Sequence, residues 1–309
     1  MRAVRLYEYG GPEKLIYEED VPDPVLGDST VLVEAVAASV NPIDWKVRSG
    51  ARQKDFPLQL PAILGKDVSG IVRAVGRDVR SFQPGDRVMA YTDATYAELV
   101  LVEGAVLTHV PEGVNLIDAA AIPLVVLTGE QLVKLAAKVQ PGQTVLVSGA
   151  LGSVGRAAVH SAKKLGAHVI AGVRARQLAE VRQLGAAESV ALDDDAALAR
   201  LPPLDAVADT VGGATAAKLL HRVRQGGSFG FASVLPEGAA ASHPTVTVTR
   251  VFARPDASKV REFADDIRDH KFVLPISRRL PLREAGAAQL LVERGGAAGK
   301  IILLAPRSE

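Results

Sequence analysis

Three glycines, Gly149, Gly152 and Gly155, separate a short apolar segment, residues 144–148, from a helix-like segment that starts near residue 156. Glycine lets the backbone turn tightly and approach a phosphate, and a helix start offers unpaired N–H groups. The next strand-like segment, residues 168–173, completes a strand–helix–strand unit of about thirty residues, the setting of a dinucleotide-binding loop. The pattern predicts a dinucleotide held by Gly149, Gly152, Ser153, Val154 and Gly155; a purely structural turn is the alternative.

Strand-like and helix-like segments alternate from residue 144 to residue 232, which predicts a parallel sheet covered by helices on both faces. Gly166 and Gly185 suit the left-handed position after a helix, and Gly226-Gly227 suit a turn. We expect strands at 144–148, 168–173, 189–192, 206–209 and 228–232, and helices at 156–165, 175–184 and 214–223. Residues 246–249 suit an edge strand, 258–270 and 282–294 two helices, and 301–304 a last strand.

The first ~110 residues read as β-rich, with strands at 31–38, 68–75 and 87–91 separated by Pro, Gly and Asp. This spacing predicts a partly open barrel or sandwich. Pro111-Glu112-Gly113 marks a boundary, and 309 residues suit two domains.

Composition excludes several classes of protein. A net charge of +1 and 4% aromatic residues argue against a nucleic-acid partner, and the absence of cysteine excludes disulfides, catalytic thiolates and Cys-ligated zinc. The N-terminus lacks the apolar stretch of a signal peptide, and the longest apolar run, residues 119–127, is too short to span a membrane. We expect a soluble cytoplasmic protein without a membrane partner.

Arg174 and Arg176 follow the second strand of the predicted dinucleotide-binding unit. An NAD-binding chain would have an acidic residue there for the ribose 2′-hydroxyl, whereas a guanidinium pairs with the 2′-phosphate of NADPH. The sequence therefore favours NADPH over NADH. The alternative interpretation is a solvated pair of arginines at a helix start.

The order of motifs resembles the zinc-independent quinone oxidoreductase branch of the medium-chain dehydrogenase/reductase superfamily. The resemblance runs nearly end to end and is carried by many short, individually modest segments. They are residues 1–4, 41–46, 64–70, 84–88, 96–98, 123–128, the loop at Gly149, 209–213 and 299–303.

This resemblance implies an α/β protein with a GroES-like β-barrel catalytic domain, residues 1–115 and 255–309, and a Rossmann domain that binds NADPH, residues 116–254. It implies that Asn41 approaches the nicotinamide ribose, that Thr128 approaches the nicotinamide or phosphates, and that five residues line the cofactor groove: Thr210, Val211, Ala232, Ser233 and Phe252. It also implies a homodimer paired through the edge strand at 246–249.

The resemblance implies no metal, because Gly65-Lys66-Asp67 stands where zinc-bearing relatives have Gly-His-Glu. The six histidines contain no H-x-x-x-H pair. Two positions depart from the family pattern: Leu192-Asp193 replaces a tyrosine-containing loop, and Thr128-Gly129 replaces a Thr-Ala pair.

Without a metal, a quinone or similar conjugated carbonyl is the expected small-molecule substrate, because charge left by a hydride is delocalised toward oxygen. The candidate polar groups are Asn41, Asp44, Lys46 and Tyr91. The simpler interpretation makes Asp44 a helix cap, Lys46 a surface residue and Tyr91 a barrel-rim aromatic. An enoyl or 2-alkenal reductase and a non-catalytic NADPH-sensing protein remain the alternative functions.

Overall fold

The computed structural model describes residues 1–295 and 298–306. They form two compact units, unit 1 from Met1–Leu124 with the segment that starts at Pro255, and unit 2 from Val125–Arg254. Sequence analysis placed the boundaries after residues 115 and 254, so the second boundary coincides and the first differs by nine residues. No helix within the described residues is long and apolar enough to cross a bilayer.

Unit 2 contains one six-stranded sheet in which all neighbouring strands are parallel. Its order is β11-β10-β9-β12-β13-β14, the 3-2-1-4-5-6 order of a Rossmann sheet. The strand order reverses between β9 and β12, which is where such sheets bind ligands at their carboxyl ends. The strands are β9 (Thr144–Ser148), β10 (His168–Val173), β11 (Glu188–Ala191), β12 (Leu204–Asp209), β13 (Val223–Phe231) and β14 (Thr247–Arg250).

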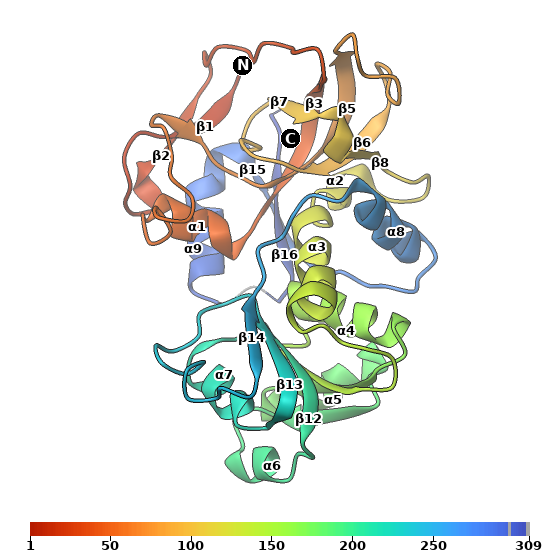
Figure 1. Ribbon diagram of the computed structural model, residues 1–309. Coiled ribbons are helices and arrows are strands. Elements are labelled where there is room, and N and C mark those ends of the chain that lie inside the picture. The colour runs from red at the N-terminus through yellow and green to blue at the C-terminus, as the bar shows by residue number, and fades with distance from the viewer. Residues whose placement is uncertain (296–297, 307–309) are drawn as a thin grey trace. The chain divides into compact units, whose positions relative to one another are not determined.

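Helices precede β9 and connect each strand to the next up to β13, whereas β13 is joined to β14 by a connection without a helix (Figure 1). Gly166 and Gly185 adopt positive φ of 79° and 60° after two of the helical segments, as predicted. The helical segments are α3 (Pro123–Gln131), a π-helix η3 (Leu132–Ala136), α4 (Ser153–Lys164), η4 (Ala175–Gln177), α5 (Leu178–Val181), η5 (Arg182–Leu184), α6 (Asp195–Ala199) and α7 (Gly213–Leu220).

The expected turn at Gly226-Gly227 is wrong, because both glycines lie inside β13. The pairing of β13 with β12 jumps from Leu204↔Val223 to Ala206↔Ser228, so the strand bulges there. Gly226 supplies the positive φ of 76° that this bulge requires. The helix expected to reach Val223 ends at Leu220 instead, because Val223 already belongs to the strand.

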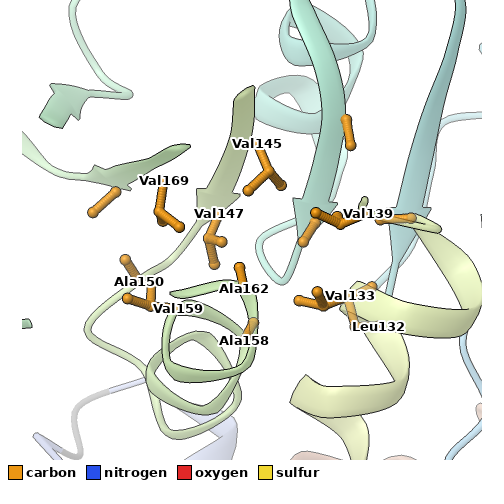
Figure 2. Packing of buried hydrophobic residues seen from close by; sticks show 14 of the residues in the cluster. Leu132, Val133, Val139, Val145, Val147, Ala150, Ala158, Val159, Ala162 and Val169 are labelled. Atoms are coloured by element: carbon orange, nitrogen blue, oxygen red, sulfur yellow. The ribbon is translucent and has the colours of Figure 1, made fainter. Parts of the chain in front are cut away.

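Small aliphatic side chains form the core between the sheet and α4 (Figure 2). Val145 and Val147 of β9 face the same core as Ala158 and Ala162 of α4. Alternate residues of a strand share a face, and residues four apart share a helix face, so this pairing follows directly from the sequence spacing.

Unit 1 contains a seven-stranded sheet built around β3, whose two halves pair with different strands. Its first half pairs with β7 and its second half with β16, while β5 lies along its other side. One long strand serving two neighbours curls the sheet into the predicted partly open barrel. The strands are β3 (Thr30–Val40), β5 (Asp67–Val75), β6 (Arg87–Tyr91), β7 (Leu99–Glu103), β8 (Leu107–His109), β15 (Ile276–Pro281) and β16 (Lys300–Leu304).

A smaller sheet and short helices complete unit 1. The sheet has the order β2-β1-β4, with β1 (Ala3–Leu6), β2 (Leu15–Glu18) and β4 (Ala62–Ile63). The helical segments are η1 (Pro12–Lys14), α1 (Pro42–Arg48), η2 (Gly104–Val106), α2 (Leu116–Ala119), α8 (Ala257–Arg268), η6 (Leu282–Glu284) and α9 (Ala285–Glu293). The last helix and strand of the chain therefore belong to the same unit as its first strands, as the resemblance implied.

Candidate functional site

The glycine loop of unit 2 joins β9 to α4 at the centre of the parallel sheet. Gly149 has φ of 63°, and a Cβ atom built on it would lie 2.4 Å from Thr210 Oγ1. A Cβ on Gly155 would lie 2.1 Å from the carbonyl oxygen of Gly149. The loop therefore closes on itself and on the end of β12 only because both positions are glycine.

Gly152 has a different environment, because it is exposed. A Cβ atom built on it would have one neighbour within 4 Å, the carbonyl oxygen of Gly149 at 3.2 Å. It is the residue before α4, and its side-chain position is left open on the outside of the loop. The backbone N–H groups of the first helical residues, Ser153, Val154 and Gly155, have no intrahelical acceptor by the geometry of a helix. An open glycine beside these donors suits an anionic dinucleotide.

Thr210 and Val211 follow β12 and contact the glycine loop. Thr210 Oγ1 donates to the Ser148 carbonyl oxygen at 2.7 Å, and its N–H donates to Ser148 Oγ at 2.9 Å. The side chain of Val211 is 45% exposed, so an apolar surface lies beside the loop.

Asp209, the last residue of β12, links the end of β9 to the residues that follow β12 through hydrogen bonds. Its fully buried carboxylate accepts hydrogen bonds from Ser148 Oγ at 2.5 Å and from the N–H of Gly212 at 2.9 Å. Burial raises the pKa of Asp209, and the hydrogen bonds from Ser148, Val211 and Gly212 oppose that shift. Sequence analysis used residues 209–213 only for the resemblance and missed this role.

The remaining predicted groove residues follow the neighbouring strands. Ala232 and Ser233 follow β13, and a Cβ on Gly212 would lie 2.7 Å from Ser233 Oγ. Phe252 follows β14, is 49% exposed, and stacks with the Arg250 guanidinium, whose carbon is 4.7 Å from the ring centroid. The carboxyl ends of parallel strands lie along one edge of the sheet, so these residues lie along the same edge as the glycine loop.

Arg174 and Arg176 lie at the same edge, directly after β10. Both are exposed, and within the described residues neither side chain forms an ion pair or hydrogen bond. Asp193 Oδ1 accepts a hydrogen bond from the Ala175 N–H at 2.7 Å and so fixes the backbone between the two arginines. The departure from the family pattern at Leu192-Asp193 thus has a local structural role.

Thr128 lies half-buried on α3, next to Gly129. A Cβ on Gly129 would lie 2.7 Å from the Val154 carbonyl oxygen and 2.6 Å from Ala157 Cβ. The second departure, Gly for Ala after Thr128, therefore lets α3 pack closely against the first turns of α4.

In unit 1, Asn41 lies at the centre of a buried polar network. Its Nδ2 atom donates to Asp67 Oδ2 at 2.7 Å, and its Oδ1 atom accepts from Lys300 Nζ at 2.7 Å. Asp67 also accepts from Ser39 Oγ at 2.6 Å. Burial lowers the pKa of Lys300, while the carboxylates of Asp67 and Asp44 oppose that shift.

Asp44 adjoins this network but is engaged as a helix cap. Its Oδ2 atom accepts from the Asn41 N–H at 2.8 Å and from Tyr96 Oη at 2.8 Å. Burial raises the pKa of Asp44 to about 6, against the two hydrogen bonds. Burial and the Asp44 charge likewise hold the pKa of Tyr96 well above its ordinary value.

Lys46 and Tyr91 are half-buried. Lys46 Nζ lies 5.6 Å from the centroid of the Trp45 ring, and burial followed by the charge of Arg52 lowers its pKa. Tyr91 lies opposite Asp67 in the pairing of β6 with β5. Burial, with the charge of Asp93, raises the pKa of Tyr91 to about 12, so its phenol is protonated at neutral pH.

A metal site would need several His, Cys, Asp or Glu side chains of the described residues close together. Among residues 1–295 and 298–306, no three His, Cys, Asp or Glu side chains are placed to hold a metal ion together. Lys66, at the position of the zinc ligand in zinc-bearing relatives, instead forms an ion pair with Asp93. The absence of a catalytic metal remains a prediction.

Two family models match this chain. The alcohol dehydrogenase GroES-like domain matches residues 27–112, and the zinc-binding dehydrogenase model matches residues 184–303.

Two curated relatives are similar in sequence. NAD(P)H oxidoreductase RTN4IP1, mitochondrial, of Mus musculus is 30% identical over 352 residues, which cover 98% of this chain and 89% of the relative. Quinone oxidoreductase of Mus musculus is 37% identical over 172 residues, which cover 55% of this chain and 51% of the relative. The chain thus spans about half the length of the mammalian quinone oxidoreductases whose sequences it matches.

Two solved structures share the fold over the whole chain. Quinone oxidoreductase from Coxiella burnetii is 29% identical with a TM-score of 0.88, over 98% of this chain and 99% of that one. Mycobacterial Rv1454c complexed with NADPH is 27% identical with a TM-score of 0.83, over 98% of this chain and 100% of that one. The chain belongs to the medium-chain dehydrogenase/reductase superfamily and within it to the quinone oxidoreductase-like proteins.

Proposed function

We propose that this protein is an NADPH-dependent oxidoreductase that reduces a quinone or similar conjugated carbonyl without a metal. The observation that carries the choice of cofactor is the pair Arg174 and Arg176, exposed and without an ionic partner in the described part of the chain. They follow β10, where a carboxylate would favour NADH. A neighbour complexed with NADPH supports this choice, and a relative named NAD(P)H oxidoreductase supports a nicotinamide cofactor.

The cofactor would be held by groups at the carboxyl ends of the parallel strands. The backbone of Gly149, Gly152, Ser153, Val154 and Gly155 would bind the pyrophosphate, and the two arginines the 2′-phosphate. The other proposed contacts come from Asn41, Thr128, Thr210, Val211, Ala232, Ser233 and Phe252. NADPH, when bound, supplies the hydride for the reduction.

The proposed substrate class rests on the polar groups of unit 1. The phenol of Tyr91, protonated at neutral pH, can donate a hydrogen bond to a carbonyl oxygen. Lys46 offers an ammonium group beside the Trp45 ring. Asp44 has its carboxylate engaged by the Asn41 N–H and by Tyr96, so we assign it a positioning role, whereas Asn41 keeps the proposed contact with the cofactor. The relatives named quinone oxidoreductase favour a quinone as the acceptor.

The test is a steady-state assay of NADPH and NADH oxidation against matched panels of quinones and 2-alkenals or enoyl thioesters. We expect turnover with NADPH, and the highest kcat/KM with a quinone. A preference for enals or enoyl substrates would assign the protein to the reductases of those compounds. Tight NADPH binding with no turnover in either panel would indicate a sensing protein instead.

We also propose a cytoplasmic homodimer paired through β14. Within the described residues β14 pairs only with β13, so its outer edge offers unpaired backbone groups to a second copy. Light scattering of the purified protein would give twice the chain mass if this proposal is correct, and the chain mass if it is wrong.

A further inference from the structure

Two histidines that are far apart in the sequence meet on the surface of unit 2. His221 follows α7, and His243 lies in the connection between β13 and β14. The Nδ1 atom of His221 is 2.9 Å from the Nε2 atom of His243. His221 is exposed and His243 is half-buried, so water reaches the pair.

The contact with Ala239 fixes which nitrogen of His243 carries the proton. Nδ1 of His243 lies 3.0 Å from the Ala239 carbonyl oxygen, which can only accept, so Nδ1 donates. With both rings neutral, Nε2 of His243 then presents a lone pair toward His221. Metal-ligating histidines have the same arrangement, in which one ring nitrogen faces the ion and the other donates a hydrogen bond, often to a backbone carbonyl oxygen.

The separation of the two nitrogens suits a particular coordination geometry. Ligands about 2.0 Å from an ion lie about 2.8 Å apart at a right angle, and about 3.3 Å apart at a tetrahedral angle. The observed 2.9 Å is the hydrogen bond that His221 Nδ1 donates to His243 Nε2, and it already equals the span of adjacent ligands in a tetragonal site. Coordination requires both rings to turn toward a common ion. It also requires the proton of His221 to move from Nδ1 to Nε2, so that both rings stay neutral and no proton is released.

We propose that His221 and His243 form a surface site for a divalent transition-metal ion, bound most tightly as Cu²⁺. Imidazole nitrogens suit Cu²⁺, Ni²⁺ and Zn²⁺, and Cu²⁺ binds more tightly than either of the others at a given set of ligands. Because the described residues offer no third protein ligand, water completes the coordination sphere.

The site lies at the opposite edge of the sheet from the proposed cofactor residues. His221 precedes β13 and His243 precedes β14, so both adjoin amino ends of parallel strands, whereas the glycine loop follows a carboxyl end. An ion bound there would tie the connection between β13 and β14 to α7. It would therefore stabilise the folded state whether or not the proposed oxidoreductase activity exists.

The experiment is calorimetric titration of protein lacking any polyhistidine tag with CuSO₄, NiCl₂ and ZnCl₂ in a non-coordinating buffer. The variants are His221→Gln and His243→Gln, and the matched control is His168→Gln, an exposed histidine paired with Glu188. We expect one Cu²⁺ per chain, weaker Ni²⁺ and Zn²⁺, at least a tenfold loss of Cu²⁺ affinity in either variant, and no change in the control.

Electron paramagnetic resonance of the Cu²⁺ complex gives a second measurement that needs no variant. An axial spectrum with coupling to two imidazole nitrogens, and a Cu²⁺-dependent rise in Tm, would support the site. Absence of saturable binding, a spectrum without two imidazole nitrogens, or affinities that are equal in the wild type and both variants would overturn it.

Discussion

The ammonium group of Lys300 lies 2.7 Å from Asn41 Oδ1, and both side chains are almost completely buried. The same nitrogen lies 3.8 Å from Asp67 Oδ2 and 3.2 Å from the Val40 carbonyl oxygen. One cation thus neutralises a buried carboxylate and, together with the Asp67 carboxylate that accepts from Nδ2, orients the Asn41 amide.

Removing this cation should be costly, because it leaves the Asp67 charge buried without a cationic partner. We expect Lys300→Met, which keeps the length of the side chain, to lower the free energy of unfolding by roughly 3 kcal/mol in urea titrations. The control is Lys218→Met, which breaks an exposed ion pair with Asp195 and should change stability far less. Equal losses in the two variants would contradict the stabilising role of Lys300.

The raised pKa of Asp44 predicts how the stability of the protein changes with pH. Its pKa is raised by burial to about 6 in the folded protein, above the ordinary 3.8, so the folded state binds the proton more tightly. This contribution is fully present below pH ~4 and is lost as the pH rises through ~6. The loss amounts to about 3 kcal/mol at most.

The measurement compares the wild type with Asp44→Asn in urea titrations from pH 4 to pH 8. The variant keeps an oxygen acceptor for the Asn41 N–H but cannot ionise. The stability of the wild type relative to the variant should therefore fall as the pH rises, mostly between pH 4 and pH 7. A difference that stays constant over this range would show that Asp44 does not titrate as described.

The parallel sheet was predictable because its inner strands β9 and β10 are short and largely apolar segments followed by glycine or a charged residue. Even the edge strand near residues 246–249 was found, as β14 (Thr247–Arg250). The bulge at Gly226 was not, since a Gly-Gly pair looks the same in a turn and in a bulge. β15 was missed because half of its sequence, the Ser-Arg-Arg of Ile-Ser-Arg-Arg-Leu-Pro, is polar and exposed.

The positions of the candidate site residues were predictable only where local sequence determines them. The glycine loop and the arginines after β10 lie within one strand–helix–strand unit, so spacing was sufficient. The partners of Asn41 come from residues 26 and 259 positions away, and the partner of Asp44, Tyr96, lies 52 positions away. Those contacts depend on how β3, β5 and β16 pair, which periodicity cannot give.

Gly149→Ala should damage the glycine loop more than backbone strain alone explains. The new methyl group would lie 2.4 Å from Thr210 Oγ1, which its own hydrogen bond to Ser148 holds in place. Gly142→Ala is the matched control, because it has a similar φ of 77° but nothing within 4 Å of the added Cβ. Both variants should lose about 1–2 kcal/mol from strain, and only Gly149→Ala should also weaken NADPH binding in calorimetry. Unchanged NADPH affinity in Gly149→Ala would remove the loop from the proposed binding site.

The two arginines after β10 should determine the choice between the pyridine nucleotides. Replacing both Arg174 and Arg176 by alanine removes the proposed partners of the 2′-phosphate and leaves the glycine loop intact. We expect the Kd for NADPH to rise roughly tenfold or more, because a charge-assisted hydrogen bond contributes about 1.5–3 kcal/mol. The Kd for NADH should stay unchanged. Arg182→Ala, an exposed arginine of η5 in the same connection, controls for the loss of positive charge alone. An equal weakening of NADPH and NADH binding in the double variant would mean that the arginines do not recognise the 2′-phosphate.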